Sequence, residues 1–172
     1  MRLFSVSIIR SCSASCARRA ARDAPDALLP AFEPLLADDD PWVRALARLQ
    51  LGKSRIALGR AGREADTYLE TALAEFRAIG ERWGISFALT ELANRIAMRG
   101  EFAAACEHLD QAIAVVTEVG AIEDVFLMRA RQAQLYWLLG DAEASAAAIA
   151  EGQRYADRSA WQNALAELAL AK

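Results

Sequence analysis

Five glycines spread over residues 59–140 constrain the fold of this chain more than any other feature. Gly59, Gly100 and Gly140 recur at intervals of about 40 residues, and so do Gly80 and Gly120. The segments between them are rich in Ala and Leu, which favour helix. A fixed period of this length predicts stacked helical hairpins, since each hairpin buries its apolar face only against its neighbours. The sequence therefore predicts an all-α protein, an α-solenoid of antiparallel helical hairpins.

The glycine period sets the expected boundaries of the repeats within residues 42–172. Each hairpin should contain two helices joined by a tight turn at one glycine and closed by the next. The first helix of a hairpin begins near a tryptophan, as at Trp42 and Trp83. We expect three hairpins and the start of a fourth, over residues 42–80, 83–120, 122–157 and, incomplete, 160–172.

Two different segments precede the repeats. Residues 1–22 contain five arginines and no acid, and we expect a flexible basic extension. In the segment 23–41, three prolines between residues 23 and 36 break the helical hydrogen-bond ladder, so only short helical pieces fit there. We expect this second segment to cap the first repeat. The acid run that ends in Asp40 precedes Pro41 and is typical of a helix N-cap rather than a metal site.

Small residues recur at fixed places in each hairpin and resemble the tetratricopeptide repeat (TPR) pattern. The second hairpin has Ala93, Gly100, Phe102, Ala105 and Ala112 in this order. The third has Ala133, Gly140, Ala142, Ser145 and Gly152, and the first keeps Gly52, Gly59, Ala65 and Ala72. The resemblance implies a right-handed superhelix whose concave groove is lined by the first helix of each hairpin. The period exceeds the usual TPR length of about 34 residues, so we expect longer helices.

Transferring the TPR pattern onto this chain predicts the residues of a partner-binding groove. They are Leu49, Lys53, Phe87, Thr90, Asn94, Met98, Leu127, Gln134 and Trp137. This lining is mostly apolar and suits an apolar or amphipathic peptide, or a segment of another protein. Only Asn94 fits the Lys/Asn clamp with which some TPR proteins hold a peptide carboxylate. The alternative interpretation is that many of these side chains are core between long helices.

No motif for catalysis, cofactor binding or metal binding emerges from the sequence. His108 has no second ligand at helical spacing, and Lys53 and the residues beside it lack the first glycine of a phosphate loop. Cys106, among alanines, is typical of a small buried hydrophobe. A net charge of −3 disfavours a nucleic-acid surface, and no apolar run is long enough to span a membrane. We therefore expect a cytoplasmic, non-enzymatic protein without cofactors.

Residues from about 28 to 172 also resemble the carboxy-terminal repeat region of AfsR-like bacterial transcriptional activators of the SARP class, whose sensor regions are similar to MalT-type repeats. The resemblance lies in DPWVRALARLQLGKSRIALGRAG, LAEFRAIGERWGISFALTELA, HLDQAIAVVTEVGAIEDV and RARQAQLYWLLGD, and FRAIGERWG is its most specific phrase. It implies an interaction or effector-sensing module that binds a peptide or protein segment. The alternative is a small-molecule effector receptor of such a regulator. DNA binding and ATPase activity do not carry over, since no residues match those motifs.

The last unit carries a prediction of its own. The apolar residues that start the fourth repeat lack a hairpin partner in the sequence given; they are Trp161, Leu165, Leu168 and Leu170. Open ends of solenoids expose apolar surface, so we expect self-association through this repeat.

Overall fold

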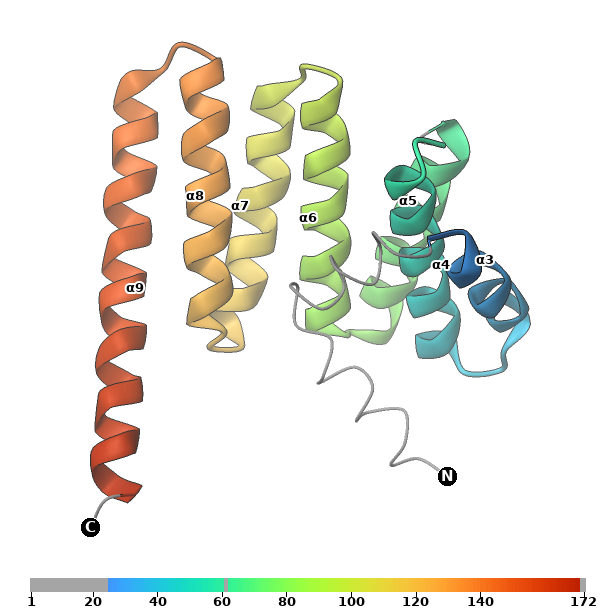
Figure 1. Ribbon diagram of the computed structural model, residues 1–172, viewed down its shortest axis with the longest axis horizontal. Coiled ribbons are helices and arrows are strands. Elements are labelled where there is room, and N and C mark those ends of the chain that lie inside the picture. The colour runs from blue at the N-terminus through green and yellow to red at the C-terminus, as the bar shows by residue number, and fades with distance from the viewer. Residues whose placement is uncertain (1–24, 61, 171–172) are drawn as a thin grey trace. The chain divides into compact units, whose positions relative to one another are not determined.

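The computed structural model describes the backbone of residues 25–60 and 62–170, and the side chains of residues 29–60 and 62–158. The regular secondary structure of these residues is entirely helical, and no strand occurs among them, which confirms the predicted fold class. The elements are α3 (Pro25–Phe32), the 3-10 helix η1 (Glu33–Ala37), α4 (Pro41–Ala57), α5 (Arg63–Ile79), α6 (Arg82–Met98), α7 (Phe102–Glu118), α8 (Ile122–Leu138) and α9 (Ala142–Leu170) (Figure 1). The chain divides into two compact units, Met1–Ala72 and Leu73–Lys172. The predictions for residues 1–22 lie outside the described residues.

Helix ends at the five glycines account for the period of the sequence. Gly100, between α6 and α7, has φ of 84°, in the left-handed region where a residue with a Cβ is strained. The Gly100 N–H donates to the Ala97 carbonyl (3.0 Å), and the Glu101 N–H donates to the Ile96 carbonyl (3.3 Å), so the last turn of α6 is closed. All five glycines have φ between 69° and 84°, as the sequence predicted for turns. Helices α4 to α8 each contain 17 residues, so two helices and two short turns fill the 40-residue period.

The first unit is built around α4. The Trp42 N–H donates to Asp40 Oδ1 (2.9 Å), which confirms the predicted N-cap. Helices α3 and η1 lie against α4, and Leu29 of α3 is buried. On α4, Gly52 approaches α5 closely, because a Cβ built there would lie 2.8 Å from a methyl group of Leu69. The absence of a side chain at this position therefore allows the two helices to pack tightly.

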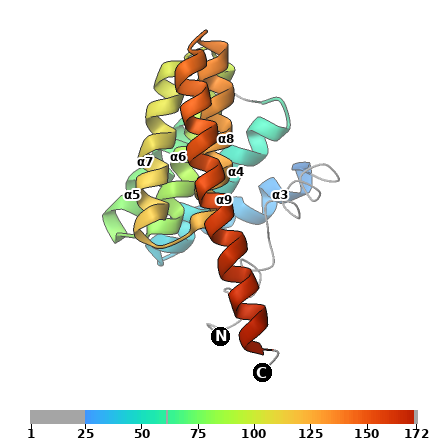
Figure 2. The same ribbon diagram turned by 90° about the vertical axis from the view of Figure 1, so that its left-hand side faces the viewer.

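The second unit contains two complete hairpins, α6–α7 and α8–α9, joined by contacts between α7 and α8. In Figure 1, α6 and α8 stand nearer the viewer than α7, and Figure 2, turned by 90°, separates α7 from α8. The small residues Ala93 and Ala105 are buried. At the equivalent places of the next hairpin, the Ser145 hydroxyl donates to the Ala133 carbonyl (2.9 Å), so these positions face each other across the hairpin.

Helix α9 differs from the prediction. The sequence analysis ended it at Asp157 and began a fourth unit near residue 160, but α9 runs without interruption from Ala142 to Leu170. Neither Gly nor Pro occurs between Asp157 and Leu170, so nothing in this segment breaks the helix. The predicted start of a fourth hairpin is therefore wrong, and these residues extend the third hairpin, as the long helix in Figure 2 shows. The side chains expected to self-associate there lie outside the described ones.

Candidate functional site

Helices α6 and α8 present matching surfaces at the same register. Counting forward 40 residues, Phe87, Thr90, Asn94 and Met98 of α6 become Leu127, Ala130, Gln134 and Leu138 of α8. Spacings of three, seven and eleven residues place each set on one side of its helix. Met98 is 65% exposed and Leu138 is 58% exposed, whereas the opposite sides of both helices are buried. We call these eight residues the α6/α8 face.

Two polar members of this face, Thr90 and Gln134, are held by local hydrogen bonds. The Thr90 hydroxyl donates to the Ser86 carbonyl (2.8 Å) one turn earlier on α6. On α8, Arg131 donates to the side-chain oxygen of Gln134 (3.0 Å), which leaves the amide nitrogen of Gln134 as a donor toward solvent. Each helix thus presents apolar side chains at both ends of the face and an amide between them.

Two of the predicted groove residues lie in the first unit. Leu49 is fully buried in α4, so the prediction that it lines a groove is wrong. It follows Ala45 and Ala47 on a helix whose apolar side chains pack inward, and the alternative interpretation as core holds there. Lys53, one helical turn later, is half-buried. The remaining predicted residues all belong to α6 and α8 of the second unit.

The register of α8 changes the assignment of one predicted residue and adds another. The predicted groove residues end with Met98 on α6 and with Trp137 on α8, but 40 residues before Trp137 stands Ala97, which is buried. The equivalent of Met98 is Leu138, which the sequence analysis did not single out. Strict application of the 40-residue period would have found it, since the turn glycines Gly100 and Gly140 fix the same offset.

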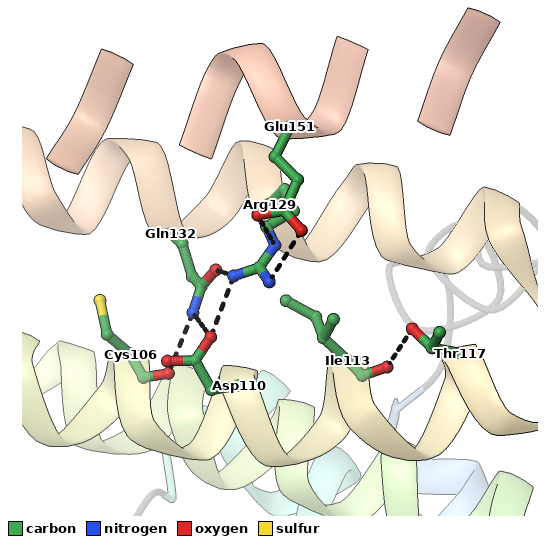
Figure 3. A network of polar contacts seen from close by, with 7 residues as sticks. All are labelled: Cys106, Asp110, Ile113, Thr117, Arg129, Gln132 and Glu151. Atoms are coloured by element: carbon green, nitrogen blue, oxygen red, sulfur yellow. Dashed lines mark hydrogen bonds and ion pairs between the residues drawn. The ribbon is translucent and has the colours of Figure 1, made fainter. Parts of the chain in front are cut away.

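A network of polar side chains joins the three helices α7, α8 and α9 (Figure 3). Gln132 of α8 is fully buried, and its amide nitrogen donates to the Cys106 carbonyl (3.1 Å) and to Asp110 Oδ1 (2.8 Å) of α7. Arg129 donates to Gln132 (2.6 Å) and Asp110 (2.9 Å) and forms an ion pair with Glu151 of α9 (3.1 Å). The buried amide of Gln132 thereby has acceptors, and the charge of Arg129 is paired with those of Asp110 and Glu151, although Arg129 Nε lies at ion-pair distance from Glu151 without hydrogen-bond geometry. The network holds one hairpin against the next.

The side chains with the most reactive groups, Cys106 and His108, are held by burial or by a backbone contact. Cys106 is buried, and its burial, followed by the charge of Asp110, raises the pKa of the thiol, so it stays protonated and unreactive. The ring nitrogen Nδ1 of His108 lies 2.9 Å from the Ala104 carbonyl on the same helix. Across residues 29–60 and 62–158 no cluster of three His, Cys, Asp or Glu side chains is arranged to hold a metal ion. Among the described helices, none combines the length and apolar character needed to cross a bilayer.

The hairpins and their glycine turns define a TPR-like helical-repeat protein. Among solved structures, that of aspartyl phosphate phosphatase F from Bacillus subtilis is similar, with a TM-score of 0.72 and 13% sequence identity. The superposition covers 84% of this chain and 38% of that one, so the chain spans well under half the length of this neighbour. At such identity the likeness establishes the fold. No protein family and no curated protein matches the sequence.

Proposed function

We propose that this chain is a non-enzymatic interaction module whose α6/α8 face binds a peptide or a protein segment. The observation that carries the proposal is the repetition of one surface pattern, apolar–amide–apolar, on α6 and again on α8 at the same register. Exposed side chains as large as Met98 and Leu138 at equivalent positions suit a ligand that lies along the face and contacts both helices. The TPR-like fold supports this proposal, because such arrays offer extended surfaces for partners.

The chemistry of the face favours an amphipathic or apolar segment. Asn94 and Gln134 are amides, which both donate and accept hydrogen bonds and so pair with a peptide backbone. From Leu127 to Leu138 the face extends about 16 Å along α8 at 1.5 Å per residue. This length accommodates roughly five residues of an extended peptide. Apolar ligand side chains would then contact Leu127 and Leu138, while the backbone between them contacts Gln134.

In the wider proposal, the module is the sensor arm of a regulator of the AfsR-like class. Its support is the resemblance of the repeat sequences, above all FRAIGERWG, where a second helix ends just before Gly80 and the next begins beside Trp83. We also propose that the protein works in the cytoplasm, where buried Cys106 would remain a free thiol. Binding of a partner segment to this module would then control the activity of the rest of such a regulator.

Selection from a displayed library of random 12-residue peptides tests the proposal on the 172-residue chain. We expect enrichment of peptides with at least two apolar side chains, and fluorescence anisotropy then measures their affinities as synthetic peptides. The double variant Met98→Glu, Leu138→Glu should weaken binding at least tenfold, since it places two charges at the apolar end of the face that both helices share. Val119→Glu changes an equally exposed apolar residue outside the face and should leave the affinity unchanged.

Enrichment of no peptide, or peptides that bind the double variant as tightly as the wild type, would refute the assignment of the face. A thermal-shift screen with metabolites addresses the alternative of a small-molecule effector. We expect no metabolite to raise the melting temperature. A rise that the double variant abolishes would replace the peptide with a small effector at the same face.

A further inference from the structure

Equivalent positions of the two hairpins in the second unit differ sharply in exposure. Ala97 of α6 is 6% exposed, whereas Trp137, 40 residues later on α8, is 70% exposed. Leu109 of α7 is fully buried, whereas its equivalent Ile149 on α9 is 59% exposed. The same contrast holds for further pairs, in which Ser86, Cys106 and Ile113 are buried and Phe126, Ala146 and Gln153 are exposed.

The reason for this contrast is the stacking of repeats. Helix α7 is covered by α8 of the following hairpin, whereas the described residues include no further hairpin to cover α8 and α9. The exposed positions on α8 and α9 are therefore the ones that would receive the next repeat in such an array. We call this the end surface, and it contains Phe126, Trp137, Ala146, Ile149 and Gln153. It carries no charged residue, and all but one of its members are apolar.

We propose that the end surface binds the end surface of a second copy of this chain, forming a two-fold symmetric dimer. A surface without charges and with large exposed apolar residues suits a partner of the same character, and an identical surface meets this requirement. In such a dimer each apolar residue of one end surface meets the end surface of the second copy. A head-to-tail arrangement would instead need the outer side of α4, the helix that starts the first repeat. Because α3 and η1 already lie against α4, the symmetric arrangement is favoured.

Trp137 and Ile149 supply the energetic centre of the proposed contact. Tryptophan is the residue most often found at interface hot spots, and its large ring here is mostly exposed in the single chain. Ile149 stands on the neighbouring helix of the same hairpin. Both residues lie outside the α6/α8 face, so the dimer leaves that face available for a ligand.

Sedimentation equilibrium of the 172-residue chain tests the proposal at concentrations from 1 to 100 μM, a range that brackets typical weak dimers. We expect a mass that rises toward twice the 18.7 kDa of one chain. Ile149→Arg should raise the dimer dissociation constant at least about thirtyfold, the effect of losing a hot-spot contact. Trp137→Glu should act in the same direction. Circular dichroism should show unchanged helicity for both variants, since each replaces an exposed side chain.

Val119→Arg is the matched control, because Val119 is 54% exposed but lies in the turn that follows α7. It should leave the dissociation constant unchanged. A monomer at 100 μM would overturn the proposal, and so would a dimer that Ile149→Arg does not weaken. A dimer weakened as strongly by Val119→Arg would also count against it, because the contact would then lie elsewhere. Retained peptide binding by Ile149→Arg separates this test from that of the α6/α8 face.

Discussion

Substitution of Gly84 by alanine should destabilise the second unit by about 2 kcal/mol. Gly84 lies in the first turn of α6, and a Cβ built there would overlap three atoms of the Phe76 ring on α5. Phe76 is fully buried, so its ring cannot move into solvent. Overpacking of this kind costs about 3 kcal/mol, at the upper end of its usual range. The better helix propensity of alanine offsets about 1 kcal/mol of this cost.

Urea unfolding followed by circular dichroism measures the effect. With a slope of roughly 1–2 kcal/mol per molar urea, the midpoint should fall by about 1–2 M. Gly62→Ala is the control, since a Cβ at Gly62 meets no atom within 4 Å. In a Phe76→Leu background the cost of Gly84→Ala should drop below about 1 kcal/mol, because the planar ring is gone. Equal stability of Gly84→Ala and wild type would refute the argument from close helix packing.

Two further predictions concern the first unit and the buried thiol. Asp40→Ala should lower the stability of the first unit by about 1 kcal/mol, because the Trp42 N–H loses its capping acceptor, and a urea midpoint equal to that of wild type would contradict this. For Cys106, the raised pKa means that the folded state keeps the thiol proton at a pH where the unfolded state releases it. Stability should therefore fall as the pH rises above the unfolded thiol pKa of about 8.5, and Cys106→Ala should remove this loss. Urea midpoints of both proteins between pH 7 and 10 measure it, and a difference that is independent of pH would show that burial does not perturb the thiol.

Local signals in the sequence predicted most of the fold. The turn glycines, such as Gly100, are recognisable in the sequence because only a residue without a Cβ readily adopts their backbone conformation. Asp40 was recognisable as a cap from the proline that follows it. The small residues Ala93 and Ala105 were assigned to helix contacts from their spacing alone, and both are buried. These features depend on neighbouring residues or on the repeat, and a sequence displays both.

Features that depend on distant partners were missed. Gly84 gave no sign of its role, since the ring that excludes a side chain there belongs to the preceding helix. The contacts of Arg129 draw on three helices, and nothing in its local sequence names those partners. Leu49 was placed on the wrong side of α4 because the pattern was transferred without knowing how the helix is rotated. On α8, a shift of one residue exchanged Trp137 for Leu138, about 100° around the helix.

The polar network of the second unit limits how its hairpins can deform. Sliding α8 along α7 by one helical turn is a displacement of 5.4 Å. It would take Gln132 away from both Cys106 and Asp110 and leave a fully buried amide without acceptors. The Arg129–Glu151 ion pair ties α9 to α8 in the same way. Helices α7, α8 and α9 therefore resist sliding past one another, so we expect these hairpins to respond to a load along their helices by bending together.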